Sequence, residues 1–402
     1  MLTAALEAEY GPAADSARVE IVRAPGRVNL IGAGTEYNDG FVLPVAIELD
    51  TWIALCRRHD GRVRVASRQS REAGSFWIDS LTPAAPAVAG AVGATLGAAG
   101  RPSGGWSEYV AGAAWSLREA ALPIRGFDGV VDTTIPIGAG LSSSAALEVA
   151  SALAVLGDGH ILSAPILAAL AQRAERDYVG VNCGIVDQFA SAAGREGRAL
   201  LLDCRSLDAR YVPLPFGVSV VVCDTGSSRQ PCSPVDDTRR AECARAVALL
   251  SERMPGLCSL RDLDAASLRR YRSILPENLA RRAEHVVSEN ARVVATAAAM
   301  EAGDLSELGR LFDESHASLR GRYEVGSPAL DVMVDVARTI PGVIAARMTG
   351  CGPGGCTVNL VLADAVPALQ AAVGREYDRR TGLRGRVYPV AVVDGAGPLA
   401  TD

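Results

Sequence analysis

Several short glycine-rich segments have the composition of phosphate-binding loops. The first reads PIGAGLSSSAALEVASALAV over residues 136–155, where Gly138, Ala139 and Gly140 precede three serines and an apolar helical pattern. Glycine lets the backbone turn sharply and approach a ligand closely. The N–H groups that begin a helix lack internal partners and carry partial positive charge. The segment is therefore either an anion-binding loop at a helix start or a strand-to-helix turn without a ligand.

A second glycine cluster, GCGPGG at residues 350–355, has the spacing G-x-G-x-x-G. A dinucleotide-binding fingerprint with this spacing must follow a strand and open a helix. Here the next residues are CTVNLVLA, a β-branched run that predicts a strand. We therefore exclude the dinucleotide site and expect a tight glycine-rich turn that leads into a strand.

The basic residues exclude several kinds of phosphate chemistry. The chain contains no lysine, so all 40 basic residues are arginine. A Walker A loop and a protein kinase each need a lysine at the phosphates, and Schiff-base chemistry needs a lysine amine. If the chain handles nucleotide phosphates, backbone N–H groups, arginine and a metal ion must balance their charge.

Length and composition indicate a folded chain of two domains or one large one. Of its 402 residues, 49% are apolar and 21% are charged, which is enough apolar surface for sizeable cores. A net charge of −6 without a basic tract argues against a nucleic-acid partner. No apolar run reaches the length of a membrane span, and the N-terminus lacks the basic region of a signal peptide. Nine scattered cysteines favour reduced thiols, so we expect a cytoplasmic protein.

Hydrophobic periodicity predicts mixed α/β structure followed by a helix-rich part. The strands are expected over residues 19–31, 41–58, 63–68, 126–136, 198–207, 218–226, 355–363 and 385–393. Helices are expected over residues 107–120, 143–156 and 163–177, and most of 237–336 is helical in pattern. The change between the two parts predicts a domain boundary near residues 207–217.

Three small-residue loops resemble the motifs of one enzyme family. They are APGRVNLIGAGTEYNDG (24–40), PIGAGLSSSAA (136–146) and MTGCGPGGCTVNLV (348–361). These loops are similar to the three motifs of the small-molecule kinase superfamily named for its galactokinase, homoserine, mevalonate and phosphomevalonate members. The chain most resembles the galactokinase family, because further galactokinase-like segments follow in the same order, at residues 177–191, 199–207, 281–290, 314–331 and 392–397.

The resemblance implies an α+β fold with two domains and an active site in the cleft between them. The N-terminal α/β domain, similar to ribosomal protein S5, would cover residues 1–207 and be completed by a C-terminal strand in 385–402. The helix-rich, ferredoxin-like C-terminal domain would cover residues 208–384.

The resemblance also implies ATP and Mg²⁺ as cofactors and assigns their residues. The loop around the ATP phosphates would consist of Gly138, Ala139, Gly140, Leu141, Ser142, Ser143 and Ser144. Ser144 and Glu175 match the family's magnesium ligands, which suits the preference of Mg²⁺ for oxygen. Asp187 matches the catalytic aspartate that orients or deprotonates the substrate hydroxyl, and Arg27 matches the arginine that keeps this carboxylate ionised.

The sugar-binding motif departs from the family pattern. Galactokinases carry Gly-Glu-His-Thr-Asp-Tyr-Asn where this chain has Gly-Ala-Gly-Thr-Glu-Tyr-Asn from residue 32 to 38. The residues expected to contact the acceptor are Ala33, Gly34, Glu36, Tyr37, Asn38, Gly184, Asp236 and Gly352. Of these, Asp236 aligns with a family tyrosine, and Pro353 aligns with a position that is phenylalanine-like in the third motif. Ala33 and Gly34 predict an enlarged, less polar pocket wall.

These departures predict a kinase whose acceptor is a ring polyol other than galactose. The acceptor would be a modified sugar or a C7-cyclitol of secondary metabolism, already phosphorylated or not, and the reacting hydroxyl would be the anomeric one or its equivalent. One alternative is a galactokinase that makes galactose 1-phosphate. The other, from a different class, is a non-catalytic sugar sensor, against which Ser144, Glu175 and Asp187 argue. The partner is a small molecule in each case, and the chain is a monomer or a homodimer.

Overall fold

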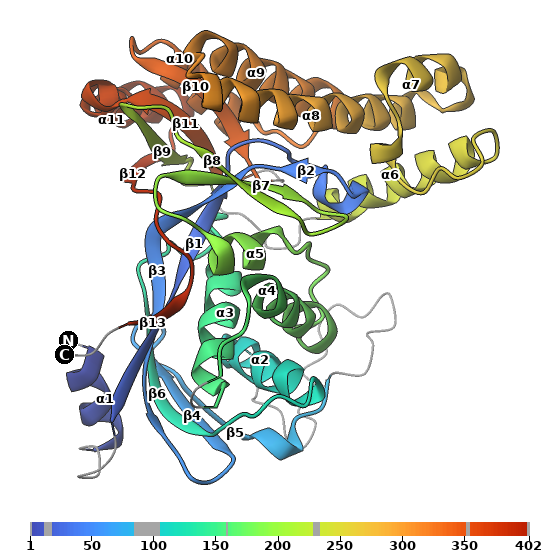
Figure 1. Cartoon of the computed structure of the whole chain (residues 1–402). Helices are drawn as coiled ribbons and strands as arrows, with labels where there is room; N and C mark the ends of the chain where they lie inside the picture. The colour runs from blue at the N-terminus through green and yellow to red at the C-terminus, as the bar shows by residue number, and fades with distance from the viewer. Residues whose placement is uncertain are drawn as a thin grey trace.

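A six-stranded sheet forms the centre of the first lobe in the computed structural model (Figure 1), which describes residues 2–11, 18–83, 105–157, 160–227, 234–350 and 354–399. Its strand order is β13-β1-β3-β6-β4-β5, antiparallel except for the β4–β6 pair. The strands are β1 (Val19–Asn29), β3 (Pro44–Arg57), β4 (Arg62–Ser67), β5 (Ala73–Trp77), β6 (Phe127–Thr133) and β13 (Gly397–Leu399).

Four helices lie together on one face of this sheet (Figure 1). They are α2 (Ser107–Glu119), α3 (Ser143–Val155), α4 (Ala164–Arg173) and α5 (Val186–Ala193), and α1 (Leu2–Tyr10) contacts β3 and β6. Helix α3 is rich in alanine and almost entirely buried, because small side chains let it lie close to both the sheet and its neighbours. This central position fixes the glycine-serine loop that precedes it.

The second lobe is built on a four-stranded antiparallel sheet in the order β10-β11-β9-β12. Its strands are β9 (Val218–Asp224), β10 (Val343–Thr349), β11 (Cys356–Leu362) and β12 (Arg386–Val390). Its helices are α6 (Pro234–Ser251), α7 (Ala265–Tyr271), α8 (Glu277–Ala302), α9 (Leu305–Ser318), α10 (Pro328–Arg338), α11 (Val366–Ala372) and α12 (Asp378–Thr381). Figure 1 shows α6 and α7 at one end of this lobe, away from its sheet.

Short elements complete the fold. A three-stranded sheet joins β2 (Phe41–Val42), β7 (Arg198–Asp203) and β8 (Ala209–Pro213). Single 3₁₀ turns occur at Glu36–Asn38, Ile78–Ser80, Leu260–Asp262, Arg272–Ile274 and Ala363–Ala365, and π-helical turns at Ala174–Val179, Leu319–Tyr323 and Val373–Tyr377. No helix in the described part of the chain is both long and apolar enough to cross a bilayer.

The elements differ from expectation near the predicted domain limits. The boundary expected at 207/208 falls inside the antiparallel β7–β8 hairpin. The segment 385–402, expected as one strand of the first domain, holds two strands: β12 pairs with β9 in the second lobe, and β13 pairs with β1 in the first. The chain therefore passes between the lobes more often than a single boundary implies, and the exact domain limits stay a prediction.

Candidate active site

A cavity of about 650 Å³ is lined by elements of both lobes. The first lobe contributes β1, the start of α3, the turn after α4 and the start of α5, and the second lobe contributes α6. Of the predicted site residues, the cavity wall contains Arg27, Ala33, Glu36, Tyr37, Gly138, Gly140, Ser142, Ser143, Ser144, Glu175, Gly184, Asp187 and Asp236. Residues that are far apart in the sequence thus meet in one cavity.

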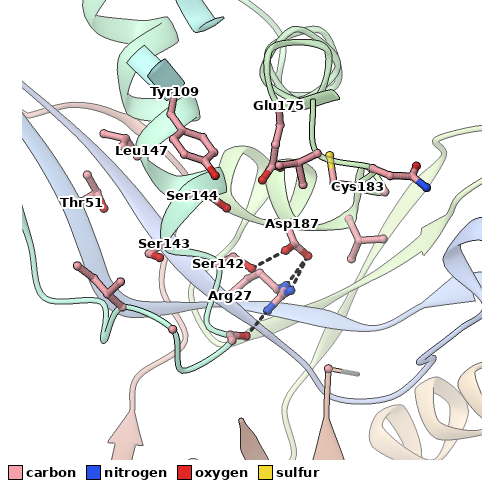
Figure 2. Close-up of a pocket in the computed structure, with 18 of the residues that line it drawn as sticks. Arg27, Thr51, Tyr109, Ser142, Ser143, Ser144, Leu147, Glu175, Cys183 and Asp187 are labelled. Atoms are coloured by element: carbon pink, nitrogen blue, oxygen red, sulfur yellow. Dashed lines mark hydrogen bonds and ion pairs between the residues drawn. The ribbon is translucent and has the colours of Figure 1, made fainter. Parts of the chain in front are cut away.

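Arg27 and Asp187 form an ion pair at the centre of this cavity (Figure 2). Arg27 Nε donates to Asp187 Oδ1 at 2.7 Å, and Arg27 Nη2 lies 2.6 Å from the same oxygen. The Ser142 hydroxyl donates to the other carboxylate oxygen, Oδ2, at 2.6 Å. With donors on both oxygens and a cation beside it, the carboxylate is held in a fixed orientation.

The glycine-serine loop is tied to the same ion pair. Arg27 Nη1 donates to the Gly140 carbonyl at 2.9 Å, and the Arg27 backbone N–H donates to the Leu141 carbonyl at 3.2 Å. Gly138 and Gly140 both have φ +80°, a conformation that glycine adopts without strain. The side chains of Ala139 and Leu141 are buried, so these two predicted residues reach a ligand only through their backbone.

Close approach also shapes β1. Its register shifts between Pro25 and Gly26, and a Cβ on Gly26 would lie 2.7 Å from the Leu141 carbonyl oxygen. Only glycine allows the strand to come this near the loop. The bulge thereby places Arg27 next to the glycine-serine loop, whose Gly140 and Leu141 carbonyls it bonds.

Glu175 lies on the π-helical turn after α4, 6% exposed and facing the cavity. Burial raises the pKa of its carboxyl, while hydrogen bonds from Cys183, Ser144 and Gln188 act in the opposite direction. Figure 2 shows Glu175, Ser144 and Asp187 around the same part of the cavity. A carboxylate and a hydroxyl beside a phosphate-binding loop are the donor set that Mg²⁺ accepts, since this ion keeps waters and phosphate oxygens in its shell.

The described residues contain no group of three or more His, Cys, Asp or Glu side chains that could hold a metal ion. A dedicated protein cage such as a structural zinc site is therefore absent from this part of the chain. The pair Ser144 and Glu175 suits an ion that phosphates help to bind.

Glu36 and its neighbours form the other end of the cavity. Burial, together with the charge of Asp187, raises the pKa of Glu36 to about 7, although Arg240 and Arg27 oppose the shift. The Arg240 guanidinium lies 4.4 Å from the centre of the Tyr37 ring, a cation–π contact. Asp236, one turn before Arg240 on α6, also lines this end.

Side chains of the second lobe hold the loop that carries the substituted motif. His285 Nε2 bonds the Ala33 carbonyl at 2.9 Å, so this nitrogen carries the proton and Nδ1 accepts from the Ser318 hydroxyl at 2.8 Å. Burial lowers the pKa of His285 to about 4, which keeps the ring neutral. The Gly32 N–H donates to Glu289 Oε1 at 3.2 Å.

The structure corrects the expectation of an enlarged wall at Gly34. Gly34 has φ +79°, and a Cβ there would lie 2.7–2.8 Å from the ring and hydroxyl of Tyr323. Tyr323 stacks on His285 with ring centroids 4.2 Å apart, and its hydroxyl contacts that of Tyr37. The space beside Gly34 is thus filled by an aromatic ring of the second lobe.

Two further residues, Asn38 and Gly352, were also predicted to contact the acceptor. Asn38 is 4% exposed, and its amide donates to the Gly34 carbonyl at 2.8 Å, so it shapes the loop instead of lining the cavity. Neither Asn38 nor Gly34 is part of the cavity wall. Gly352 and Pro353 lie outside the described residues.

Several wall residues have no strong signal in the sequence. Aromatic and small polar side chains of the first lobe line the end near the glycine-serine loop: Thr51, Ser67, Gln69, Trp106, Tyr109 and Thr133. They stand in ordinary strands and helices or in the turns beside them, so only the fold brings them together. The charged residue Arg240 lies next to the predicted Asp236 and could have been found from the helical spacing of α6.

Family models match three parts of the chain. Residues 5–57 match the galactokinase galactose-binding signature, residues 108–195 the N-terminal domain of GHMP kinases, and residues 296–379 their C-terminal domain. A galactokinase of Roseiflexus sp. strain RS-1 is 44% identical over 379 residues, which is 94% of this chain and 92% of the relative. This chain belongs to the galactokinase-like GHMP kinase family. It is an ATP-dependent sugar kinase, as predicted.

Other relatives agree with this assignment. A galactokinase of Chloroflexus aurantiacus is 43% identical over the same shares of the two chains. The structure of Lactococcus lactis galactokinase in complex with galactose superposes with a TM-score of 0.88 at 33% identity, covering 99% of this chain and 98% of that one. The mevalonate kinase of Methanococcus jannaschii has a TM-score of 0.64 at 16% identity, covering 95% and 100% of the two chains, and supports the fold alone. The predicted two-domain GHMP kinase fold is therefore confirmed.

Proposed function

We propose that this chain transfers the γ-phosphoryl group of ATP to the anomeric hydroxyl of a sugar, with galactose as the first candidate acceptor. The observation that carries the proposal is the Arg27–Asp187–Ser142 arrangement beside the glycine-serine loop. It supplies a fixed carboxylate within reach of both an acceptor hydroxyl and a bound phosphate chain. The galactose-binding signature and the galactokinase relatives support galactose.

In the proposed reaction, Asp187 orients the acceptor hydroxyl and takes its proton. The acceptor oxygen forms a bond to the γ-phosphorus as the bond from that phosphorus to the bridging oxygen breaks, so that ADP leaves. Arg27 pairs with one oxygen of Asp187 and holds the carboxylate in place, and Ser142 fixes its second oxygen. Phosphoryl transfer depends mainly on such positioning and on charge neutralisation.

Ser144 and Glu175 would hold the magnesium ion that accompanies ATP. Bound there, Mg²⁺ would neutralise charge on the phosphates. The backbone N–H groups at the start of α3 would face the same phosphates, which suits an anion at a helix N-terminus. Because the chain has no lysine, arginine and backbone donors supply the remaining positive potential.

A second candidate is an acceptor other than galactose, such as a modified sugar or C7-cyclitol, with or without a phosphate of its own. One specific observation favours it: Ala33 and Gly34 replace the Glu and His of the family motif, and the Tyr323 ring occupies the space beside Gly34. A pocket that lacks a hydrogen-bond partner for a sugar hydroxyl discriminates against that sugar. The named relatives nevertheless support galactose more strongly, and nothing in the comparisons supports a role in secondary metabolism or the sensor alternative.

The deciding experiment measures ADP release with galactose and with a panel of sugars, sugar phosphates and cyclitols, at equal concentrations. The ³¹P spectrum of each product identifies the hydroxyl that was phosphorylated. We expect galactose to give galactose 1-phosphate with the highest kcat/KM of the panel. A cyclitol or phosphorylated sugar that exceeds galactose by about tenfold or more, which is roughly 1.4 kcal/mol in the barrier, would replace galactose by the second candidate. If no acceptor in the panel causes ADP release, both candidates are contradicted.

A further inference from the structure

Behind Glu175, two fully buried polar side chains continue inward from the cavity. Gln188 on α5 donates from Nε2 to Glu175 Oε2 at 2.6 Å and to Glu148 Oε2 on α3 at 2.9 Å. Glu148 and Gln188 are both 0% exposed, and neither is part of the cavity wall. We propose that Glu148 and Gln188 are positioning residues, which hold the Glu175 carboxylate in the orientation that binds the metal ion of the kinase reaction.

The geometry of the Gln188 amide gives this series of hydrogen bonds a direction. An amide NH₂ group has two hydrogens, and here each points to a carboxylate on a different element. Glu148 therefore fixes the rotation of the Gln188 amide, and the amide fixes Glu175 Oε2. The Ser144 hydroxyl and the Cys183 thiol also bond Glu175, so its donors come from three separate segments.

The same residues are a poor choice for stability alone. In the described part of the chain, Glu148 Oε1 and Gln188 Oε1 are buried without a hydrogen-bond partner. An unsatisfied buried polar atom costs about 1–3 kcal/mol. Apolar side chains between α3 and α5 would avoid this cost, and the residues within two positions of Glu148 on α3 are alanine, leucine and valine. A positioning role accounts for the polar pair where packing does not.

The inference rests on the proposed magnesium site, so the test measures metal binding directly and not through activity. The probe is Mn²⁺ with ADP, and the free ion is quantified by its paramagnetic resonance signal. Changing outer-shell partners of a metal ligand commonly lowers affinity by about 10–100-fold. We expect Gln188→Met and Glu148→Leu to weaken Mn²⁺ binding about tenfold or more. Glu148→Gln should remain within about threefold of the wild type, because its amide oxygen still accepts from Gln188.

Matched controls separate positioning from a loosened core. Ser151→Ala changes a buried hydroxyl one turn after Glu148 on α3. Ser191→Ala changes a buried hydroxyl on α5 that bonds the Pro25 carbonyl and not a carboxylate. Both variants should keep the wild-type affinity for Mn²⁺, even where thermal unfolding shows a small loss of stability.

The outcomes distinguish this inference from the proposed metal site itself. Glu175→Gln should lose Mn²⁺ binding; if it binds like the wild type, the metal assignment fails. If Glu175→Gln loses the ion while folded Gln188→Met and Glu148→Leu keep it, the positioning inference is overturned. Equal losses in Glu148→Leu and Glu148→Gln would also overturn it. Should Gln188→Met not fold, Gln188→Asn withdraws the amide by one methylene and is expected to show the same loss of affinity.

Discussion

The two ends of the cavity are built in different ways. The phosphoryl-transfer region (Arg27, residues 138–144, Glu175 and Asp187) is held mainly by bonds within the first lobe, where Arg27, Ser142 and Asp187 bond one another directly. One bond reaches it from the second lobe, from the Cys356 thiol to the Ala139 carbonyl at 2.9 Å. The acceptor region (residues 33–38, Asp236 and Arg240) depends on the second lobe. There His285 bonds the Ala33 carbonyl across 252 residues of sequence, and Tyr323 contacts Tyr37 across 286.

This difference indicates that chemistry and acceptor choice can change separately. Substitutions in residues 33–38 alter one end of the cavity without removing any bond of the Arg27–Asp187 pair. The phosphoryl-transfer region would therefore tolerate a new acceptor, provided that the second lobe still supports the loop. The following predictions test that separation.

The largest effect is expected at Asp187. Asp187→Asn removes the proton acceptor and the partner of Arg27, while the loop that would bind ATP stays in place. General-base groups contribute about 10²–10⁴-fold, so we expect kcat to fall by that factor with ATP affinity changed less than about threefold. ADP-release assays and calorimetric titration with a non-hydrolysable ATP analogue measure the two quantities.

Asp50→Asn is the matched control for this prediction. Asp50 accepts from Arg23 Nε at 2.7 Å in a second Arg–Asp pair on β1 and β3, and it is not part of the cavity wall. It should retain turnover. Near-normal kcat in Asp187→Asn, or an equal loss in Asp50→Asn, would remove Asp187 from the proposed mechanism.

The second effect concerns the support of the acceptor region. Gly34→Ala places a Cβ against the Tyr323 ring at a positive φ. Overpacking costs about 1–3 kcal/mol, and the left-handed conformation about 1–2 kcal/mol more. Urea unfolding should therefore show a loss of about 2–5 kcal/mol, and Gly34→His, which restores the family residue, should not fold better than Gly34→Ala.

Gly217→Ala separates backbone strain from collision. Gly217 has φ +76°, close to that of Gly34, but a Cβ there meets no atom within 4 Å. We expect the free energy of unfolding of Gly217→Ala to fall only by the cost of backbone strain, about 1–2 kcal/mol. If the two alanine variants are equally stable, Tyr323 does not constrain residue 34.

The phosphoryl-transfer region was largely predictable from the sequence because its signals are local. Glycine spacing before an apolar helix predicted the loop and α3, and the resemblance supplied Arg27, Glu175 and Asp187, all of which the fold brings to one cavity. The strand and helix positions of the first lobe also followed from periodicity, as in β4 and α2. Even so, short elements such as β8 were not predicted, since a strand of five residues with only Val212 buried gives little periodic signal.

The acceptor region was less predictable because tertiary packing decides it. A small residue at position 34 suggests free space, but whether space exists depends on a ring supplied from residue 323. Likewise, Asn38 looks like a polar ligand in sequence and serves as a hydrogen-bond donor inside its own loop. Gln188 sits beside the predicted Asp187, yet its partner Glu148 can be recognised only once α3 and α5 are packed together.

The third prediction uses the pKa of Glu36. This pKa is about 7 in the folded chain against an ordinary value of 4.5, so between these values the folded state holds a proton that the unfolded state has lost. Stability from this group is therefore present below pH 4.5 and lost as pH rises through 7. Glu36→Gln cannot ionise and should be more stable than the wild type by about 1–3 kcal/mol at pH 8, and equal to it near pH 4.5.

Urea unfolding of both proteins at the two pH values measures this difference. The acid destabilisation caused by buried His285 is common to both and cancels. Glu48→Gln, an exposed carboxyl on β3, is the control and should show no such pH-dependent gain. If Glu36→Gln gains the same stability over the wild type at both pH values, Glu36 is ionised at both, and burial does not raise its pKa.

The smallest effect is expected at the contact between the Tyr37 and Tyr323 hydroxyls, where the second lobe meets the acceptor loop. Tyr37→Phe removes the hydroxyl but keeps the ring under Arg240. One hydrogen bond contributes about 0.5–1.5 kcal/mol, so KM for the acceptor should rise about two- to tenfold while kcat stays near its wild-type value. Tyr323→Phe removes the same bond and keeps the stack on His285, so the double variant should lose less than the sum of the two single losses. A fall in kcat as large as the rise in KM would show that the loop also aligns the acceptor with Asp187, and the two regions would then not be separable.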